Sequence, residues 1–143
     1  MKFTELIDLF KEGKATSKSH MKNLLEMAMI DSHFDDYEYQ LLKKLAKKHK
    51  VSDKELKKIQ ENPAEVKFEL PVDAIEKFEQ FYELINMMTI DEKIYEEEVN
   101  LCIIFAKKFG YKNQQELVDA ITQNIKNGLP WEETRKRVGL LLQ

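Results

Sequence analysis

The sequence predicts an all-α protein, a single-domain bundle of about seven to eight helices over residues 1–143. Apolar residues recur at intervals of three and four along nearly the whole chain, which is the period of an amphipathic helix. No segment alternates apolar and polar residues over the length of a strand with the β-branched residues that strands favour. Only 4 glycines and 3 prolines interrupt the 143 residues, so long irregular stretches are not expected.

The apolar period predicts eight helices, and several have recognisable start or stop signals. They are expected at residues 3–12, 18–31, 36–49, 53–61, 73–90, 95–109, 114–126 and 131–141. Ser52 with Glu55, and Asn113 with Glu116, have the spacing of a capping box at the start of a helix. Gly128 follows the seventh predicted helix, where a C-terminal stop is expected.

The chain is predicted to consist of two related helical halves in one domain. The segment 61–73 contains two prolines and indicates a connector. The halves, at about residues 20–60 and 73–117, look like copies offset by 60 positions. The identical pairs are Leu24/Leu84, Met27/Met87, Ile30/Ile90, Asp31/Asp91, Glu38/Glu98, Leu41/Leu101, Ala46/Ala106, Lys47/Lys107 and Lys48/Lys108. We interpret this pattern as an internal duplication of a helix-loop-helix unit.

Each half places an aspartate and a glutamate seven residues apart between its two helices. Asp31 continues the apolar stripe of one helix and Glu38 begins the stripe of the next, and Asp91 and Glu98 repeat this arrangement. Inward-facing carboxylates repel each other and need a cation, a hydrogen-bond donor, a proton or water. Oxygen ligands suit hard divalent ions. The sequence therefore indicates a calcium, magnesium or manganese site at these four acids if the two hairpins bring them together.

A structural role for the acids is the alternative. Asp35 and Glu38 have capping-box spacing, and acids in a first helical turn suit the helix dipole. Tyr95 occupies the corresponding position before Glu98, so this explanation is not expected to cover the second half. Asp91, like its counterpart in the first half, lies near a helix C-terminus, where the dipole disfavours a carboxylate. Metal binding and local capping both stay open at this point.

The acidic pattern resembles that of the TerB-like tellurite-resistance family. Here an apolar helix is followed by Ile30-Asp31-Ser32 and then Glu38, and again by Ile90-Asp91-Glu92 and then Glu98. The family motif reads Ala-Asp-Gly and then Glu, so both glycines are missing. The resemblance covers roughly residues 20–112. It implies two related helical hairpins, metal ligands at Asp31, Glu38, Asp91 and Glu98, and a role in stress response or tellurite resistance.

Composition and motifs argue against several functional classes. The formal net charge of -3 gives no general attraction to nucleic acid or to an anionic membrane. The lysine-rich run 43–58 has no interleaved aromatic residues, so a solvated face or a surface for an acidic partner is expected. None of His20, His33 and His49 follows a glutamate by three residues, which argues against a di-iron bundle.

The single cysteine and the lack of a long apolar run predict a cytoplasmic protein without membrane insertion. Cys102 cannot form an internal disulfide and is expected in the core. No apolar stretch approaches the roughly 20 residues that cross a bilayer.

We therefore expect a non-enzymatic, divalent-metal-binding helical protein, because no phosphate loop, nucleophile–base pair or dinucleotide fingerprint is present. The alternative is a protein–protein interaction module whose acids are structural. In that case the lysine-rich face or the segment 129–143 binds an unknown protein partner. A hydrolase that uses the acids with a bound metal is a weaker third possibility. Both a monomer and a homodimer remain open.

Overall fold

The chain folds into a helical bundle, which confirms the all-α prediction. The computed structural model describes residues 2–30 and 34–143, and at residues 5–13 it describes the backbone alone. This part forms seven α-helices and two short 3₁₀-helices, and contains no strand. The α-helices are α1 (Phe3–Met29), α2 (Asp36–Lys48), α3 (Asp53–Glu61), α4 (Ala74–Thr89), α5 (Glu96–Lys108), α6 (Gln114–Lys126) and α7 (Trp131–Arg137). The 3₁₀-helices are η1 (Pro63–Glu65) and η2 (Gly139–Leu142).

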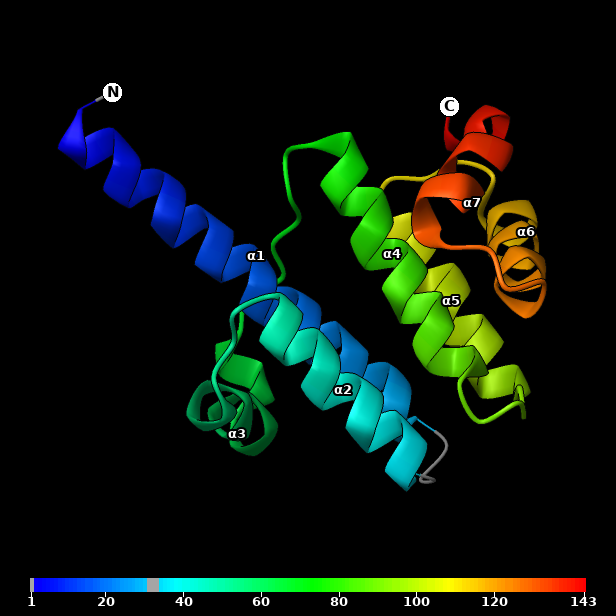
Figure 1. The fold of residues 1–143 in the computed structure, drawn as a ribbon, viewed down its shortest axis with the longest axis horizontal. Helices are drawn as coiled ribbons and strands as arrows, with labels where there is room; N and C mark the ends of the chain where they lie inside the picture. The colour runs from blue at the N-terminus through cyan, green and yellow to red at the C-terminus, as the bar shows by residue number, and fades with distance from the viewer. Residues whose placement is uncertain (1, 31–33) are drawn as a thin grey trace.

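Helix α4 lies at the centre of the bundle and packs against α1, α2, α5, α6 and α7 (Figure 1). A helix that is apolar on most of its surface must be covered on most sides. The buried residues of α4 are Phe78, Gln80, Phe81, Glu83, Leu84, Ile85, Met87 and Met88. Two of these residues are polar, and Glu83 is the polar group around which one candidate site forms.

The N-terminal region is one continuous helix, whereas the sequence predicted two helices at 3–12 and 18–31. Gly13 lies inside α1, where glycine costs about 1 kcal/mol relative to alanine. Helix α1 contains no proline, so every amide after Gly13 can still bond within the helix. Helix α1 packs against α2, α3 and α4, with buried residues between Ser19 and Ala28, and this packing outweighs the weak local signal. The first turns of α1 extend beyond the other helices (Figure 1).

Helices α2 and α5 end in the same way. Lys50 and Gly110 both have a positive φ, 59° and 88°, in the position after the C-cap residue. The next amides, of Val51 and Tyr111, donate to helix carbonyls five residues earlier at 2.8 and 3.0 Å. These bonds form the Schellman motif, in which glycine is the usual residue with positive φ. In α2 the motif follows the C-cap residue His49, whose side chain contacts α4.

The predicted capping signals have different outcomes. The capping box of Ser52 and Glu55 is present at the start of α3, and Gly128 has the positive φ of a helix stop. The predicted box of Asn113 and Glu116 is wrong. The Asn113 side chain makes no capping bond, and instead donates a hydrogen bond to a C-terminal backbone carbonyl at 3.4 Å.

The end of the chain is less regular than predicted. The expected helix 131–141 is interrupted after Arg137, and the 3₁₀-helix η2 follows. Gly139 begins this second segment, where it weakens the continuation of the helix. Val138 is nonetheless buried, so the end of the chain packs on the core.

The two helical hairpins are present as packed pairs, α1 with α2 and α4 with α5. Their origin by internal duplication stays a prediction. The connector between them contains Val66, Phe68 and Leu70, which pack against the core as expected. No helix in the described part of the chain is both long and apolar enough to cross a membrane.

Candidate functional site

The structure brings together two of the four predicted acids and adds a third. Asp35, Glu38 and Asp91 each offer one carboxylate oxygen, and these oxygens lie within 4.8 Å of one another. We call these three residues the acidic site. Asp31, the fourth acid of the predicted set, lies outside the described residues, as does His33.

Local structure places each carboxylate of the acidic site. Asp35 is the N-cap of α2, and its Oδ1 accepts a hydrogen bond from the Glu38 amide at 2.9 Å, which confirms the predicted cap. Glu38 lies in the first turn of α2 and is 2% exposed. Asp91 lies in the turn after α4, and its Oδ1 accepts from the Lys93 amide at 3.1 Å. The site therefore joins the start of one hairpin's second helix to the turn of the other hairpin.

Glu98 is buried like Glu38, but it is not among the three convergent carboxylates. Its Oε1 accepts a hydrogen bond from the Tyr95 amide at 3.1 Å. This is the glutamate half of a capping box, and it requires only the backbone of the N-cap residue. The expectation that capping would not cover the second half is therefore wrong for Glu98, because an acid can cap a helix from its third position.

The electrostatics of the acidic site favour a cation. Asp35 and Asp91 are half-buried while Glu38 is buried, so the site is only partly open to solvent. Like charges at these separations repel each other, and burial increases the cost of keeping all three ionised. A divalent ion among the three oxygens would offset both effects. The donors are oxygens alone, which suits calcium, magnesium or manganese.

A second group of possible ligands consists of His20, His49 and Glu83, which we call the histidine site. The Nε2 atoms of both histidines lie 2.7 Å from the same carboxylate oxygen, Glu83 Oε1. The three side chains come from α1, from the C-cap of α2 and from α4. His20 is 0% exposed and Glu83 is 4% exposed, so most of this site is enclosed.

The other oxygen of Glu83 is bound by Lys48. The ammonium Nζ lies 2.6 Å from Glu83 Oε2 and also 2.6 Å from Glu79 Oε2. Burial favours the neutral form of Glu83, but the hydrogen bonds from His20 and His49 outweigh it and hold the pKa of this carboxyl well below its usual range. For Lys48, burial is likewise outweighed by the bonds to the two glutamates, which raise the pKa of its ammonium.

Burial determines the charge of His20. It lowers the pKa of the imidazole by more than the hydrogen bond to Glu83 raises it, so the ring is neutral near pH 7. The geometry assigns the proton to Nε2, which donates to Glu83. His20 Nδ1 then carries a lone pair, and it has no hydrogen-bond partner among the described residues.

The histidine site was missed because its residues are far apart in the sequence. His20 and Glu83 are separated by 63 positions, and His49 and Glu83 by 34, so no local motif connects them. The available signal was a polar residue on an apolar stripe. His49 lies four residues after Leu45, and Glu83 lies four residues before Met87, so both fall on helix faces that pack inward.

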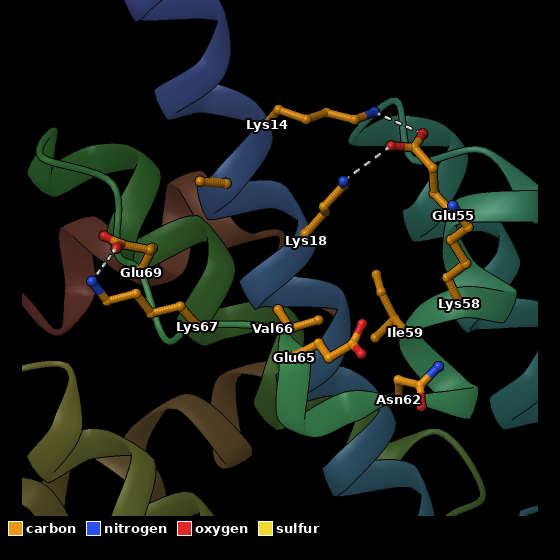
Figure 2. Close-up of a pocket in the computed structure, with 11 residues that line it drawn as sticks. Lys14, Lys18, Glu55, Lys58, Ile59, Asn62, Glu65, Val66, Lys67 and Glu69 are labelled. Atoms are coloured by element: carbon orange, nitrogen blue, oxygen red, sulfur yellow. Dashed lines mark hydrogen bonds and ion pairs between the residues drawn. The ribbon is translucent and has the colours of Figure 1, made fainter.

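An open groove of about 670 Å³ lies between α1, α3 and the connector after α3 (Figure 2). Figure 2 shows Lys14 and Lys18 directed towards Glu55, at 2.9 and 3.6 Å. The hydrogen bond from Lys14, together with that from the Ser52 amide, lowers the pKa of Glu55 to about 2. These contacts satisfy the charges on this wall internally, so we interpret them as a tie between α1 and α3.

The single cysteine lies in the core, as predicted. Cys102 is 1% exposed, and its thiol contacts the sulfur of Met88 at 3.7 Å. Burial raises the pKa of this thiol, and the nearby Glu98 carboxylate raises it further. The thiol therefore stays protonated at neutral pH and is a poor nucleophile.

Comparison with known proteins adds no assignment: no protein-family model, curated protein or solved structure matches the chain. The resemblance to the TerB-like family stays a prediction based on the acidic pattern.

Proposed function

We propose that this protein binds a hard divalent cation at the acidic site formed by Asp35, Glu38 and Asp91. The observation that supports the proposal is the convergence of one oxygen from each carboxylate within 4.8 Å. Calcium binds oxygen ligands at 2.3–2.6 Å, so two oxygens on one ion are separated by at most about 5 Å. The observed spacing is compatible with a shared ion without a large movement of the helices.

The composition of the site suits calcium or manganese better than a caged magnesium ion. Three carboxylates supply a formal charge of -3, and solvent can complete the coordination sphere because two of the three are half-buried. Magnesium demands near-ideal octahedral geometry and gives up its bound water molecules reluctantly. Calcium accepts irregular sets of oxygen ligands. The proposed role is binding rather than catalysis, since the sequence contains no phosphate loop and no nucleophile–base pair. The resemblance to TerB-like proteins points in the same direction and adds a stress-related role to the proposal.

Isothermal titration calorimetry with calcium, manganese and magnesium chloride tests the proposal. We expect saturable binding of one ion, and we expect Asp91→Asn to weaken it at least about 10-fold, because the substitution removes one charged ligand. An ion at 100 times its Kd stabilises the native state by about 2.7 kcal/mol, so the unfolding temperature of the wild type should rise with metal.

Glu97→Gln is the matched control, since it removes one negative charge from an exposed residue six positions after Asp91 and outside the set of convergent carboxylates. It should bind the ion like the wild type. The proposal fails if none of the three ions gives saturable binding, or if Asp91→Asn binds as tightly as the control.

A further inference from the structure

The histidine site contains a donor set that the acidic site lacks, two imidazole nitrogens with one carboxylate oxygen. His20, His49 and Glu83 each offer a donor atom within 4.8 Å of the others. Two histidines and one carboxylate are the protein ligands of several open zinc sites, and the same set also binds iron. The three ligands come from three separate helical segments, so their convergence is a product of the tertiary fold.

We propose that the histidine site binds a transition-metal ion of intermediate softness, with zinc as the representative ion, independently of the acidic site. Zinc holds nitrogen and oxygen ligands at about 2.0–2.2 Å, so neighbouring ligands of a tetrahedral ion lie about 3.3 Å apart. The two Nε2–Oε1 distances are 2.7 Å without an ion. Each must therefore lengthen by roughly half an ångström, which side-chain rotation can supply.

The protonation states are compatible with metal binding. Zinc uses the lone pair of an imidazole nitrogen, so the proton on each Nε2 has to leave that atom when the metal binds. On binding, each Nε2 forms a bond to zinc and the ring proton moves to Nδ1, while Glu83 Oε1 exchanges its two N–H donors for the ion. His20 Nδ1 is free to take this proton, because no hydrogen bond from a described residue occupies it.

His20 Nδ1 also limits the affinity of the site for zinc. Metal-bound histidines usually donate their other N–H to an acceptor, and loss of such an acceptor lowers metal affinity by about 10- to 100-fold. His20 Nδ1 has no acceptor in the described part of the chain. The structure therefore points to a zinc site weaker by about that factor than one with complete outer hydrogen bonding.

Lys48 competes with the metal ion. Its ammonium holds Glu83 Oε2, but its side chain is 43% exposed, so the ammonium can leave Glu83 for solvent. The His49 side chain is 14% exposed, so the site borders solvent on this side. Removing the positive charge of Lys48 should strengthen zinc binding, whereas a purely structural network predicts no such gain.

Titration of the full-length chain with zinc at pH 7.5 tests the inference. We expect one zinc ion per chain, at least about 10-fold weaker binding in His49→Gln, and several-fold tighter binding in Lys48→Gln. Asp91→Asn should bind zinc like the wild type, because it alters only the acidic site. This control separates the two sites, so failure of the calcium or manganese experiment does not decide this one.

The inference is wrong if the wild type shows no saturable zinc binding, or if His49→Gln binds zinc as tightly as the wild type. It is equally wrong if zinc binding is lost in Asp91→Asn instead, since the ion would then lie in the acidic site. Cobalt provides a measurement that needs no variant. Wild-type protein should give the intense visible absorption of a four- or five-coordinate cobalt ion, and the weak spectrum of the hexa-aqua ion would overturn the proposal.

Discussion

At the scale of single residues, Lys50 shows the cost of a backbone conformation. It has a φ of 59° after α2, where Gly110 occupies the same position after α5 with a φ of 88°. The left-handed region costs a residue with a Cβ roughly 1–2 kcal/mol relative to the right-handed one. The Lys50 carbonyl accepts a hydrogen bond from Lys14 at 2.6 Å, a contact of the backbone that does not depend on the Lys50 side chain.

We expect Lys50→Gly to stabilise the protein by about 0.5–1 kcal/mol, because relief of the strain exceeds the entropy that glycine adds to the unfolded chain. Urea unfolding measures the change. Gly110→Ala is the reciprocal control. It should destabilise the protein by about 1 kcal/mol because alanine is strained at this positive φ. A steric clash does not contribute, since an added Cβ has no neighbouring atom within 4 Å. A loss of stability in Lys50→Gly would show that the lysine side chain has a role of its own.

At the scale of elements, Lys14 and Lys18 of α1 both pair with one glutamate of α3, Glu55. Glu55 caps α3 through Ser52 and pairs with Lys14 of α1 at 2.9 Å. Its side chain is 29% exposed, so solvent screens the pair, and exposed pairs contribute up to about 1 kcal/mol.

The Glu55 pair should make stability depend on pH in the acid range. The pKa of Glu55 is about 2 in the folded protein against 4.5 ordinarily, so the unfolded chain binds more protons between these values. Stability from this group is complete above about pH 4.5 and is lost as the pH falls towards 2. Glu55→Gln retains a capping acceptor but not the charge, and should cost about 0.5–1 kcal/mol at pH 6.

Unfolding of the wild type and Glu55→Gln at pH 6, 4 and 2.5 measures this dependence. The difference in free energy of unfolding should shrink as the pH falls. A constant difference would mean that packing rather than charge accounts for the effect. Glu65→Gln, which alters an exposed acid of the same groove, should show no such trend.

Local signals in the sequence predicted most helices, and long-range packing explains where they failed. Ser52 and Asp35 cap their helices as expected, because each cap joins residues three positions apart, whereas Asn113 bonds a distant carbonyl instead. Gly13 did not end its helix, because tertiary contacts of α1 override a propensity of about 1 kcal/mol. For the acidic site, the inward direction of Glu38 followed from helix periodicity. The contribution of Asp35 was not predicted. Its spacing to Glu38 indicates only a helix cap, and nothing local shows that the same carboxylate also faces Asp91 of the other hairpin.

At the scale of the whole molecule, the histidine site connects α1, α2 and α4 through one buried carboxylate. Glu83 accepts hydrogen bonds from both histidines and pairs with Lys48, so its charge is shared by three donors. Nothing in the local sequence could have predicted this connection, because its partners lie 34 and 63 positions away.

Glu83→Gln should destabilise the metal-free protein by about 2 kcal/mol. Hydrogen bonds to a charged group contribute roughly 1.5–3 kcal/mol, and the neutral amide of glutamine is a poorer acceptor for the three donors than the carboxylate. Urea unfolding in the presence of EDTA measures this cost. Glu79→Gln is the matched control; it loses only the contact with Lys48 and should cost less than about 1 kcal/mol. Equal losses in the two variants would mean that the histidines contribute nothing through Glu83.

The continuity of α1 has a mechanical consequence. With 27 residues and no break at Gly13, the helix is a stiff rod about 40 Å long. Its first turns stand clear of the other helices (Figure 1), and its last residue, Met29, lies six positions before the Asp35 of the acidic site. Between these ends it carries Lys14 of the groove and His20 of the histidine site, so one continuous helix connects the two. A displacement of α1 along its axis therefore moves one wall of the groove and one ligand of the histidine site together.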